Sequence, residues 1–491
     1  MSFRAIWVWS HEKGETVRLR FSRRYSTVEH RAKVLSGSQY VAVPDDCVLL
    51  QHIFSKLGLE DPDRLYVASR DDCVLHQESL ILELNPDGPG RGKLWPLLTL
   101  THGALIMACL CLIDSPASSQ PPLSNQVSVC QGIALLSDLQ AFLSAGSKTP
   151  DHDTLVSRLD LLPSVFSHIC PLGTPVDTPH TTMFPLLAVA TTSGSQKQPA
   201  WKSGFHKGKS TVSVSVTETV RSMQYGSHSK QDLWDVYGNV ICKCEVEGVQ
   251  PSITVTLSLP PNGSPLQDIL AHPCVNALDT STLTSSSMDY GDGSTFSGPY
   301  KFPFSPPLEP FRVCSYTSQV PVPPILGTYH LNEDLGQVQL NVLLKLHESV
   351  TNSFEYCEAH LPFFNRCQMG SLDVKVTSGQ VEVSKEKNLL VWVLGQKFPK
   401  SREVMLEGAI NFSGQTAGPT DPLCTDGTAY VKLYFRIPDL TLSGCCVDQH
   451  SVQVYSSTKP RVVTSRDLVS SEYYIWNSTG HTPMLPSTLM M

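Results

Sequence analysis

Residues 209–220 read KSTVSVSVTETV, and this stretch decides the fold of the second half of the chain. Val212, Val214 and Val216 alternate with Ser and Thr. A period of two is typical of a β-strand with one buried and one wet face. The same β signal continues to about Trp476, and it recurs at residues 253–259, 338–342, 389–394 and 431–435. We therefore predict a second half that is all-β, with few ordered helices.

Length and composition indicate more than one folded body. The chain has 491 residues, more than one hydrophobic core usually organises, so we expect two domains and a linker. Its 36 Pro and 31 Gly indicate many turns, as a sandwich with long crossing loops requires. Charged residues make up only 17%, which is typical of surfaces that bury against partners. The net charge of −8 argues against nucleic-acid binding, because neutralising phosphates needs a dominant basic field.

The start of the chain predicts a β-hairpin. Residues 5–9 (AIWVW) are aromatic or β-branched, residues 12–15 form a turn signal, and Val17, Leu19 and Phe21 alternate with charges. The first 33 residues carry eight Lys or Arg against three Glu. Two interpretations of this basic excess stay open: a solvated face, or a surface that docks an acidic partner or an anionic membrane.

Residues 94–113 contain no formal charge over twenty positions, a length that could also span a bilayer. Pro96 lies near the start, and Thr101, His102 and Gly103 interrupt the middle with a polar, turn-like break. We predict two buried strands joined by a tight turn, and a membrane span is the minor alternative.

Helical periodicity follows these strands. Apolar residues recur at Ile133, Leu136, Leu139 and Leu143. A second pattern, which Asp151 or Asp153 would cap, recurs at Leu155, Leu159, Leu162 and Phe166. Strands and helices together predict an α+β first domain.

The chain between the two predicted domains has linker composition. Residues 171–202 are rich in Thr, Ser, Pro and Gln and have no periodicity. We predict four regions: an α+β domain (1–146), a helical segment with a flexible linker (147–204), an all-β domain (205–476) and a disordered tail (477–491).

Motifs that would carry enzyme chemistry are incomplete. GFHKGKS at 204–210 resembles a phosphate-binding loop, but three residues separate its glycines where four are needed. A strand pattern also follows it, where a helix should begin. His347 and Glu348 begin like a zinc-protease helix, but Thr351 stands where the second His is required. The sequence predicts no enzyme, no cofactor and no metal centre.

The 15 cysteines form no CxxC pair and no Cys/His cluster at zinc spacing, which favours reduced thiols in the cytosol. Cys242 with Cys244, and the adjacent Cys445 and Cys446, could indicate metal or redox chemistry. In strand-like sequence such pairs are more often packed thiols. No secretory signal is recognisable, so we expect the sequons, including that at Asn477, to stay unmodified.

The second half resembles the medium subunits of adaptor-protein complexes. The segments that carry the resemblance are Trp201 with Gly204 and 209–220, GNV (238–240) with GVQP (248–251), AHPCV (271–275), FPFSPPLEPF (302–311) and KNLLVW (387–392). A branch of this family, the medium subunits of the fifth adaptor complex, is similar in further segments: QPAWK (198–202), NGSPLQDIL (262–270), SQVPVPPILG (318–327) and SSEYYIW (470–476). Each motif alone is weak, but their order along the chain is specific.

The resemblance implies a fold, partners and a location. It implies a longin-like first domain that docks into the adaptor core, and a mu homology domain built as a two-part β-sandwich. The implied partners are two large subunits and one small subunit in a heterotetramer, with spatacsin and spastizin associated. The implied role is sorting and retrieval between late endosomes or lysosomes and the Golgi, with the subunit in the cytosol and on the cytosolic face of those membranes.

Cargo recognition in this family implies strand addition, in which an extended tail pairs with a sheet edge. We take the strand with Val212, Val214 and Val216 as the candidate edge. Family members that read tyrosine-based tails use an aromatic and an Asp on this strand and a Trp-x-Arg on a late strand. Those positions fall on Ser213, Ser215, Val463 and Ser465. A tyrosine oxygen would be left poorly paired there, at a cost of about 1–3 kcal/mol. We therefore predict that the chain does not read tyrosine-based tails in the usual way.

Two other classes of protein stay open at this point. One is a free-standing cargo or scaffold adaptor that bears a mu-like domain without a tetramer. The other is an unrecognised hydrolase, which would require polar groups that converge in a deep pocket.

Overall fold

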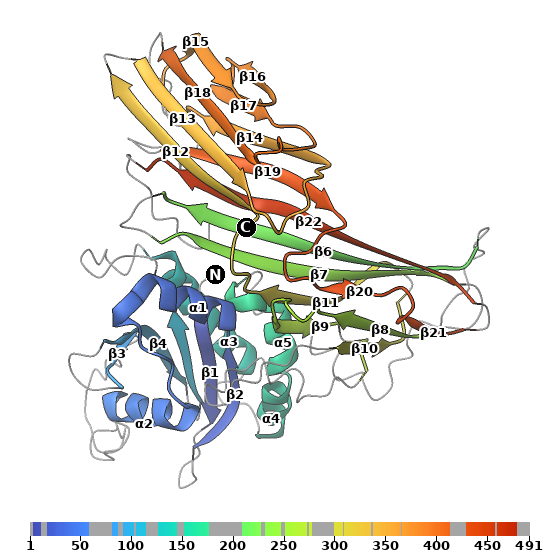
Figure 1. The fold of residues 1–491 in the computed structure, drawn as a ribbon. Coiled ribbons are helices and arrows are strands. Elements are labelled where there is room, and N and C mark those ends of the chain that lie inside the picture. The colour runs from blue at the N-terminus through green and yellow to red at the C-terminus, as the bar shows by residue number, and fades with distance from the viewer. Residues whose placement is uncertain are drawn as a thin grey trace. The chain divides into compact units, whose positions relative to one another are not determined.

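The structure, a computed structural model (Figure 1), folds as two compact units, one within residues 1–197 and one within residues 198–483. The described residues are 3–10, 17–57, 81–86, 92–102, 105–113, 126–144, 152–175, 209–226, 231–246, 251–272, 274–276, 299–307, 309–334, 337–364, 366–412, 429–456 and 459–478.

The first unit is α+β, as the sequence predicts. Its five-stranded sheet has the order β2 (Arg18–Arg24), β1 (Phe3–Ser10), β5 (Leu105–Cys111), β4 (Leu94–His102), β3 (Ile81–Leu84). Its helices are α1 (Ser26–Ser36), α2 (Asp46–Leu57), α3 (Val127–Ser144), α4 (His152–Asp160) and α5 (Leu162–Ile169), with short 3-10 turns at Gly37–Gln39 and Pro171–Gly173. The predicted hairpin is confirmed as β1 and β2, which pair antiparallel.

Residues 94–102 and 105–111 form two paired strands, β4 and β5, as predicted, and not one membrane-spanning helix; the predicted turn between them lies outside the described residues. Helices lie on both faces of this sheet. Leu49 and Ile53 of α2 pack with Trp7 and Trp9. On the other face α3 approaches β4 so closely that a Cβ on Gly132 would come within 2.4 Å of Leu98.

α3 confirms the first helical prediction except at one position. Leu136, Leu139 and Leu143 are buried, but Ile133 is 40% exposed, because the buried stripe runs through Leu135 and Phe142 instead. By length and composition alone α3 could cross a membrane; it is the one such helix among the described residues, and its apolar face packs inside this unit.

The second helical prediction is wrong in its continuity. Residues 155–166 form two helices, α4 and α5, which are separated at Leu161. Pro163 lies in the first turn of α5, where its missing N–H costs nothing, whereas inside one long helix it would remove a hydrogen bond. Because α4 begins at His152, position 153 lies within the helix and not at its N-cap, and Asp151 is outside the described residues.

The segment predicted as helix and linker contributes to the first unit. Phe166 of α5 stacks on Phe21 of β2 with ring centroids 4.5 Å apart. The Tyr25 hydroxyl donates to the Cys170 carbonyl at 3.0 Å. Residues 152–173 therefore belong to this packed body, and residues 176–208 of the predicted linker lie outside the described residues.

Part of the N-terminal basic excess forms internal ion pairs. Arg4 is buried and makes a two-pronged contact with Glu29, with N–O distances of 2.8 and 2.7 Å. Arg24 pairs with Asp46 at 2.7 Å. These two arginines hold β1 and β2 to the helices, a role that neither interpretation of the charge pattern anticipated.

The second unit is all-β, as predicted. A nine-stranded sheet has the order β16 (Gln380–Ser384), β17 (Leu389–Val393), β14 (Tyr356–Pro362), β19 (Tyr430–Pro438), β22 (Arg461–Trp476), β6 (Thr211–Gln224), β7 (Leu233–Glu245), β11 (Phe311–Ser318), β9 (Leu266–Ala271). A second sheet contains β10 (Tyr300–Phe304), β8 (Ser252–Ser258), β20 (Cys446–Val447) and β21 (Gln453–Tyr455). A third has the order β12 (Ile325–Asp334), β13 (Gln337–Leu346), β18 (Glu403–Phe412), β15 (Met369–Val376).

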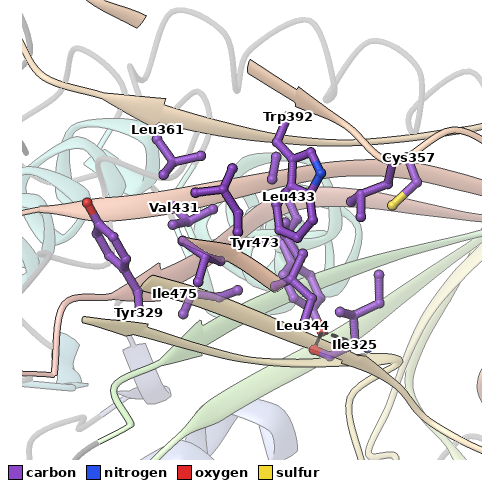
Figure 2. Close-up of a cluster of buried hydrophobic side chains, with 14 of the residues drawn as sticks. Ile325, Tyr329, Leu344, Cys357, Leu361, Trp392, Val431, Leu433, Tyr473 and Ile475 are labelled. Carbon is purple, nitrogen blue, oxygen red and sulfur yellow. Dashed lines mark hydrogen bonds between the residues drawn. The ribbon is translucent and has the colours of Figure 1, made fainter. Parts of the chain in front are cut away.

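Two separate hydrophobic cores make this unit a two-part sandwich. One core joins β8, β10 and part of β20 to β6, β7 and β11. The other joins β12, β13 and β18 to β14, β17, β19 and β22, and Figure 2 shows Trp392, Leu344 and Tyr473 within it. β6 contributes to both cores, through Val216 and Val220, and is continuous between them (Figure 1).

Side-chain amides seal the outer edge of β12. The Gln224 amide donates to the Ile325 carbonyl at 2.8 Å and accepts from the Gly327 N–H at 2.6 Å. The Asn477 amide does the same for Leu331, accepting from its N–H at 2.9 Å and donating to its carbonyl at 3.2 Å. Asn477 is 3% exposed, so the first residue of the predicted tail belongs to the fold. Residues 479–491 lie outside the described residues.

Candidate functional site

β6 is a central strand, so the prediction that it forms a free sheet edge is wrong. It pairs antiparallel with β7 on one side and parallel with β22 on the other, which occupies its main-chain donors and acceptors. Val212, Val214 and Val216 are 1% exposed or less and belong to a core. Alternation in sequence reports the two faces of a strand and contains no information about its hydrogen-bonded neighbours.

The structure brings all four predicted pocket positions together. In the parallel register Ser213 is opposite Val463, and Ser215 is opposite Ser465. Because β-strand side chains alternate, these four share the face opposite the buried valines. The sequence-based assignment therefore identified one contiguous patch, although its two halves are 250 residues apart.

This face is rich in hydroxyl groups at the four predicted positions. Across β6, Ser215 is opposite Ile241 and Ser213 is opposite Lys243, both on β7. Ile241 and Val463 are each 38% exposed, and Lys243 forms an ion pair with Glu245 at 2.6 Å. At the four predicted positions there is no aromatic ring, carboxylate or guanidinium. The patch can offer apolar contact and hydroxyl hydrogen bonds.

The free edge lies one strand away from the predicted one, on the first half of β22. β19 pairs with β22 only from Asp467 onward, and none of the described strands covers the preceding residues on that side. The Arg461 N–H donates to the Ser210 carbonyl at 2.8 Å, so the odd-numbered residues point their main chain toward β6. Val462 and Thr464 therefore point their N–H and C=O groups outward, where no described residue pairs with them.

One end of this open edge, which comprises residues 461–466, is closed. The Asp439 N–H donates to the Arg466 carbonyl at 2.8 Å, where β19 takes over the pairing. Arg436 then holds Asp467 at 2.9 Å and Glu355 at 3.2 Å. The open edge therefore ends at a fixed point.

Glu218 is a buried carboxylate that the sequence analysis missed. It lies on β6 and is fully buried. It accepts hydrogen bonds from the Tyr316 hydroxyl at 2.9 Å, the Leu442 N–H at 2.6 Å and the Ser443 N–H at 3.2 Å, and from the Ser443 hydroxyl. Burial raises the pKa of Glu218 above its ordinary 4.5, although the hydrogen bonds oppose this. Its contacts fix the turn that connects β19 to β20.

Tyr316 reaches Glu218 because its neighbour on β7 is a glycine. The Tyr316 ring lies over Gly238, and a Cβ there would come within 2.0 Å of the ring. The register pairs the two residues directly. Sequence offered one signal for Glu218: it continues the buried row of Val212, Val214 and Val216 at the same period of two.

A family model named for the adaptor complexes medium subunit family matches residues 199–476. The chain belongs to this family. It is 48% identical to AP-5 complex subunit mu-1 of Homo sapiens over 495 residues, and this covers 100% of both chains. It is also 26% identical to AP-5 complex subunit mu of Arabidopsis thaliana over 394 residues, which covers 69% of this chain and 60% of that one.

Solved structures also resemble this member of the medium subunit family. The Fcho1 mu homology domain of Danio rerio with bound Eps15 peptide is 12% identical, with a TM-score of 0.39, and the match covers 55% of this chain and 99% of that one. The yeast delta-COP-I mu-homology domain is 10% identical, with a TM-score of 0.37, and the match covers 54% and 97%.

Family membership confirms the resemblance drawn from the sequence and excludes the hydrolase class. Medium subunits are non-enzymatic parts of adaptor complexes in vesicle traffic, so this chain works with other adaptor subunits. Such subunits are cytosolic and associate with membranes peripherally.

Three of the four paired cysteines of this family member, Cys242, Cys244 and Cys445, are packed thiols, and Cys446 is half-buried. Burial raises the pKa of Cys242 and Cys445 to about 12 and that of Cys244 to about 11, so these groups stay protonated at neutral pH. Among the described residues no cluster of His, Cys, Asp or Glu could hold a metal ion. The loop at 204–210 lies mostly outside the described residues, and β6 follows it as a strand rather than a helix.

Proposed function

We propose that this chain is the medium subunit of an AP-5 heterotetramer, with two large subunits and one small subunit as partners. The observation that supports this is the identity of 48% to AP-5 complex subunit mu-1 over the full length of both chains. Residues 1–146, together with the packed residues 152–173, would be the longin-like docking domain, and residues 205–476, together with Asn477, the mu homology domain.

The same proposal includes a place of action. The subunit sorts and retrieves cargo between late endosomes or lysosomes and the Golgi, from the cytosolic face of late endosome and lysosome membranes. Spatacsin and spastizin associate with the complex, and no nucleic acid is involved. The net charge of −8 is consistent with the last point.

Affinity purification of the tagged full-length chain tests the assembly. Two large subunits and one small subunit should co-purify in equal amounts, together with spatacsin and spastizin. Recovery of the chain without large subunits would instead support the free-standing cargo or scaffold adaptor. Recovery of the tetramer without spatacsin and spastizin would remove only those two partners.

Cargo binding, we further propose, takes place by strand addition on the open edge (residues 461–466) and does not use tyrosine chemistry. Val462 and Thr464 supply the outward main-chain groups, and Ser213, Ser215, Val463 and Ser465 form the adjoining face. Strand addition draws its affinity from main-chain hydrogen bonds, which any extended segment can make. The absence of ring-binding groups at the four positions removes the usual preference for tyrosine.

Calorimetry with a tyrosine-based tail peptide and its alanine counterpart tests this second part. We expect equal, weak binding of the two peptides to the wild-type chain. A gain-of-function variant that combines Ser213→Phe, Ser215→Asp, Val463→Trp and Ser465→Arg should acquire a preference for tyrosine. Tight, tyrosine-dependent binding to the wild type would contradict the proposal.

A further inference from the structure

Among the described residues, one end of the open edge is blocked and the other end leaves room for a bound segment to continue. At Arg466 the pairing passes to β19, and the Arg436–Asp467 ion pair fixes that junction. At Arg461 the register with β6 begins, opposite Thr211, and no described strand lies beyond it on the outer side. Any segment longer than the paired stretch must therefore run out past Arg461.

Cations gather at this same end. Arg461 is exposed and shares the wet face with Thr211. Lys459 lies two residues before Arg461, and Lys209 lies two residues before Thr211; both are exposed. The Thr211 hydroxyl donates to the Lys209 carbonyl at 3.0 Å, which fixes the start of β6 beside them.

The acidic residue that the register places here is already neutralised. Glu245 is opposite Thr211, but it holds Lys243 at 2.6 Å. Lys209, Lys459 and Arg461, which we call the basic exit, therefore form a local positive field in a chain whose net charge is −8. The cations border a row of outward main-chain donors and acceptors, which a peptide can use and a lipid headgroup cannot.

We propose that the basic exit selects extended peptides that carry Asp or Glu just beyond the strand-paired stretch. This inference rests on the proposed strand addition at residues 461–466. Main-chain pairing holds the uncharged part of the peptide, and the three cations attract the carboxylates that follow. Selectivity thus comes from the open end of the edge instead of from a tyrosine pocket.

Short synthetic peptides test the proposal on the full-length chain in its adaptor complex. Each peptide has an uncharged, β-branched centre with a run of Glu at one terminus, and its control has Gln in the same places. Both termini are tested, because strand addition can be parallel or antiparallel. At low salt the better Glu peptide should bind about tenfold more tightly than its Gln control, and this advantage should shrink as salt is added.

Variants distinguish charge selection by the basic exit from main-chain pairing on the open edge. Changing Lys209, Lys459 and Arg461 to Gln should abolish the Glu advantage. The matched control, Lys301, Lys385 and Lys387 to Gln, removes three exposed cations elsewhere and should leave the advantage intact. Thr464→Pro deletes an outward N–H that pairs with no described residue, and it should weaken both peptides alike.

Each contrary outcome has a distinct meaning. Equal binding of the Glu and Gln peptides, with both weakened by Thr464→Pro, would overturn the basic exit and leave strand addition standing. Binding that is indifferent to Thr464→Pro would overturn strand addition itself. If the Gln variant of the basic exit keeps the wild-type preference for the Glu peptide, the three cations do not select acidic segments and the proposal fails. If the wild type shows no Glu preference and the Gln variant loses binding to phosphatidylserine vesicles, the patch is a membrane contact and the proposal fails as well.

Discussion

Glu218 offers the sharpest test of how the second unit is held together. Replacing it with Ala would leave four hydrogen-bond donors without their acceptor: the Tyr316 and Ser443 hydroxyls and the N–H groups of Leu442 and Ser443. Each buried donor that loses its partner costs about 1 kcal/mol or more. Four such donors give about 4 kcal/mol, and removal of the buried carboxylate offsets part of this sum. We expect Glu218→Ala to cost about 2–4 kcal/mol.

Glu218→Gln is the matched control. Its amide oxygen can still accept from Leu442 and Ser443, and its N–H groups can donate to the hydroxyl oxygens of Tyr316 and Ser443 once those rotate. The shape of the side chain is unchanged, so we expect a cost of about 1 kcal/mol at neutral pH.

The raised pKa of Glu218 gives this pair of variants a pH dependence with a definite sign. Because burial raises the pKa above 4.5, the native state binds the proton more readily than the unfolded chain does. The stabilisation from protonation is complete below 4.5 and is lost as the pH rises through the folded-state pKa. The wild type should therefore gain stability relative to Glu218→Gln as the pH falls from neutral toward 4.5.

Hydrogen exchange is the appropriate assay, because a chain of two units does not unfold in a single two-state step. The amides of Leu442, Ser443 and Cys445 should exchange much faster in Glu218→Ala and only slightly faster in Glu218→Gln. Amides of β1 and β5, in the other unit, serve as internal controls. Unchanged exchange at residues 442–445 in the Ala variant, or equal damage from Ala and Gln, would refute this account of the carboxylate.

Three further predictions follow from single contacts. Gln224→Leu removes both amide bonds to β12, so exchange at Gly327 should accelerate by an amount equivalent to about 2–3 kcal/mol, and an unchanged rate would show that the β12 edge is not sealed by this residue. Arg4→Met leaves the buried Glu29 with the Tyr40 hydroxyl but without its charged partner, and should cost about 3–5 kcal/mol, read from the exchange of the β1 and α1 amides; the double variant with Glu29→Met should recover much of it, and no recovery would contradict the ion-pair argument. At mildly alkaline pH iodoacetamide should label the exposed Cys47 and Cys130 long before Cys242, whose pKa of about 12 leaves little thiolate, and mass spectrometry would expose the error if Cys242 reacted as fast.

The sequence was sufficient for the all-β class of the second unit and for the buried face of its first strand. Alternation at Val212, Val214 and Val216 reports which side chains are buried, and the structure confirms it. The same alternation is compatible with an edge strand and with a central strand, because main-chain pairing leaves no trace in side-chain polarity. The sequence therefore assigned the free edge to the wrong strand. The pairing of β6 with β22, which the sequence does not show, corrects this assignment.

The burial of Glu218 could have been predicted from the same alternation of residues. Glu218 lies on the buried face of β6, between Val216 and Val220. A buried carboxylate requires hydrogen-bond partners. Those partners, Tyr316 and Ser443, lie about 100 and 225 positions away in the chain, and nothing local identifies them. The hydrogen bonds of the Gln224 and Asn477 amides to β12 could not be predicted for the same reason. In a sequence, a Gln or Asn that bonds to a distant strand looks the same as one that is exposed to solvent.

The arrangement of the candidate site separates affinity from selectivity. Main-chain pairing on the open edge requires only that Val462 and Thr464 keep their outward groups free, and no side chain enters that requirement. In the proposed mode of binding, serine at 213, 215 and 465 removes the preference for a tyrosine without disturbing those groups. At the closed end, Arg436 already has Asp467 and Glu355 as partners, so it has little charge to offer a ligand. Discrimination between segments of similar strand propensity must then arise where the ligand leaves the edge, beside Lys209, Lys459 and Arg461.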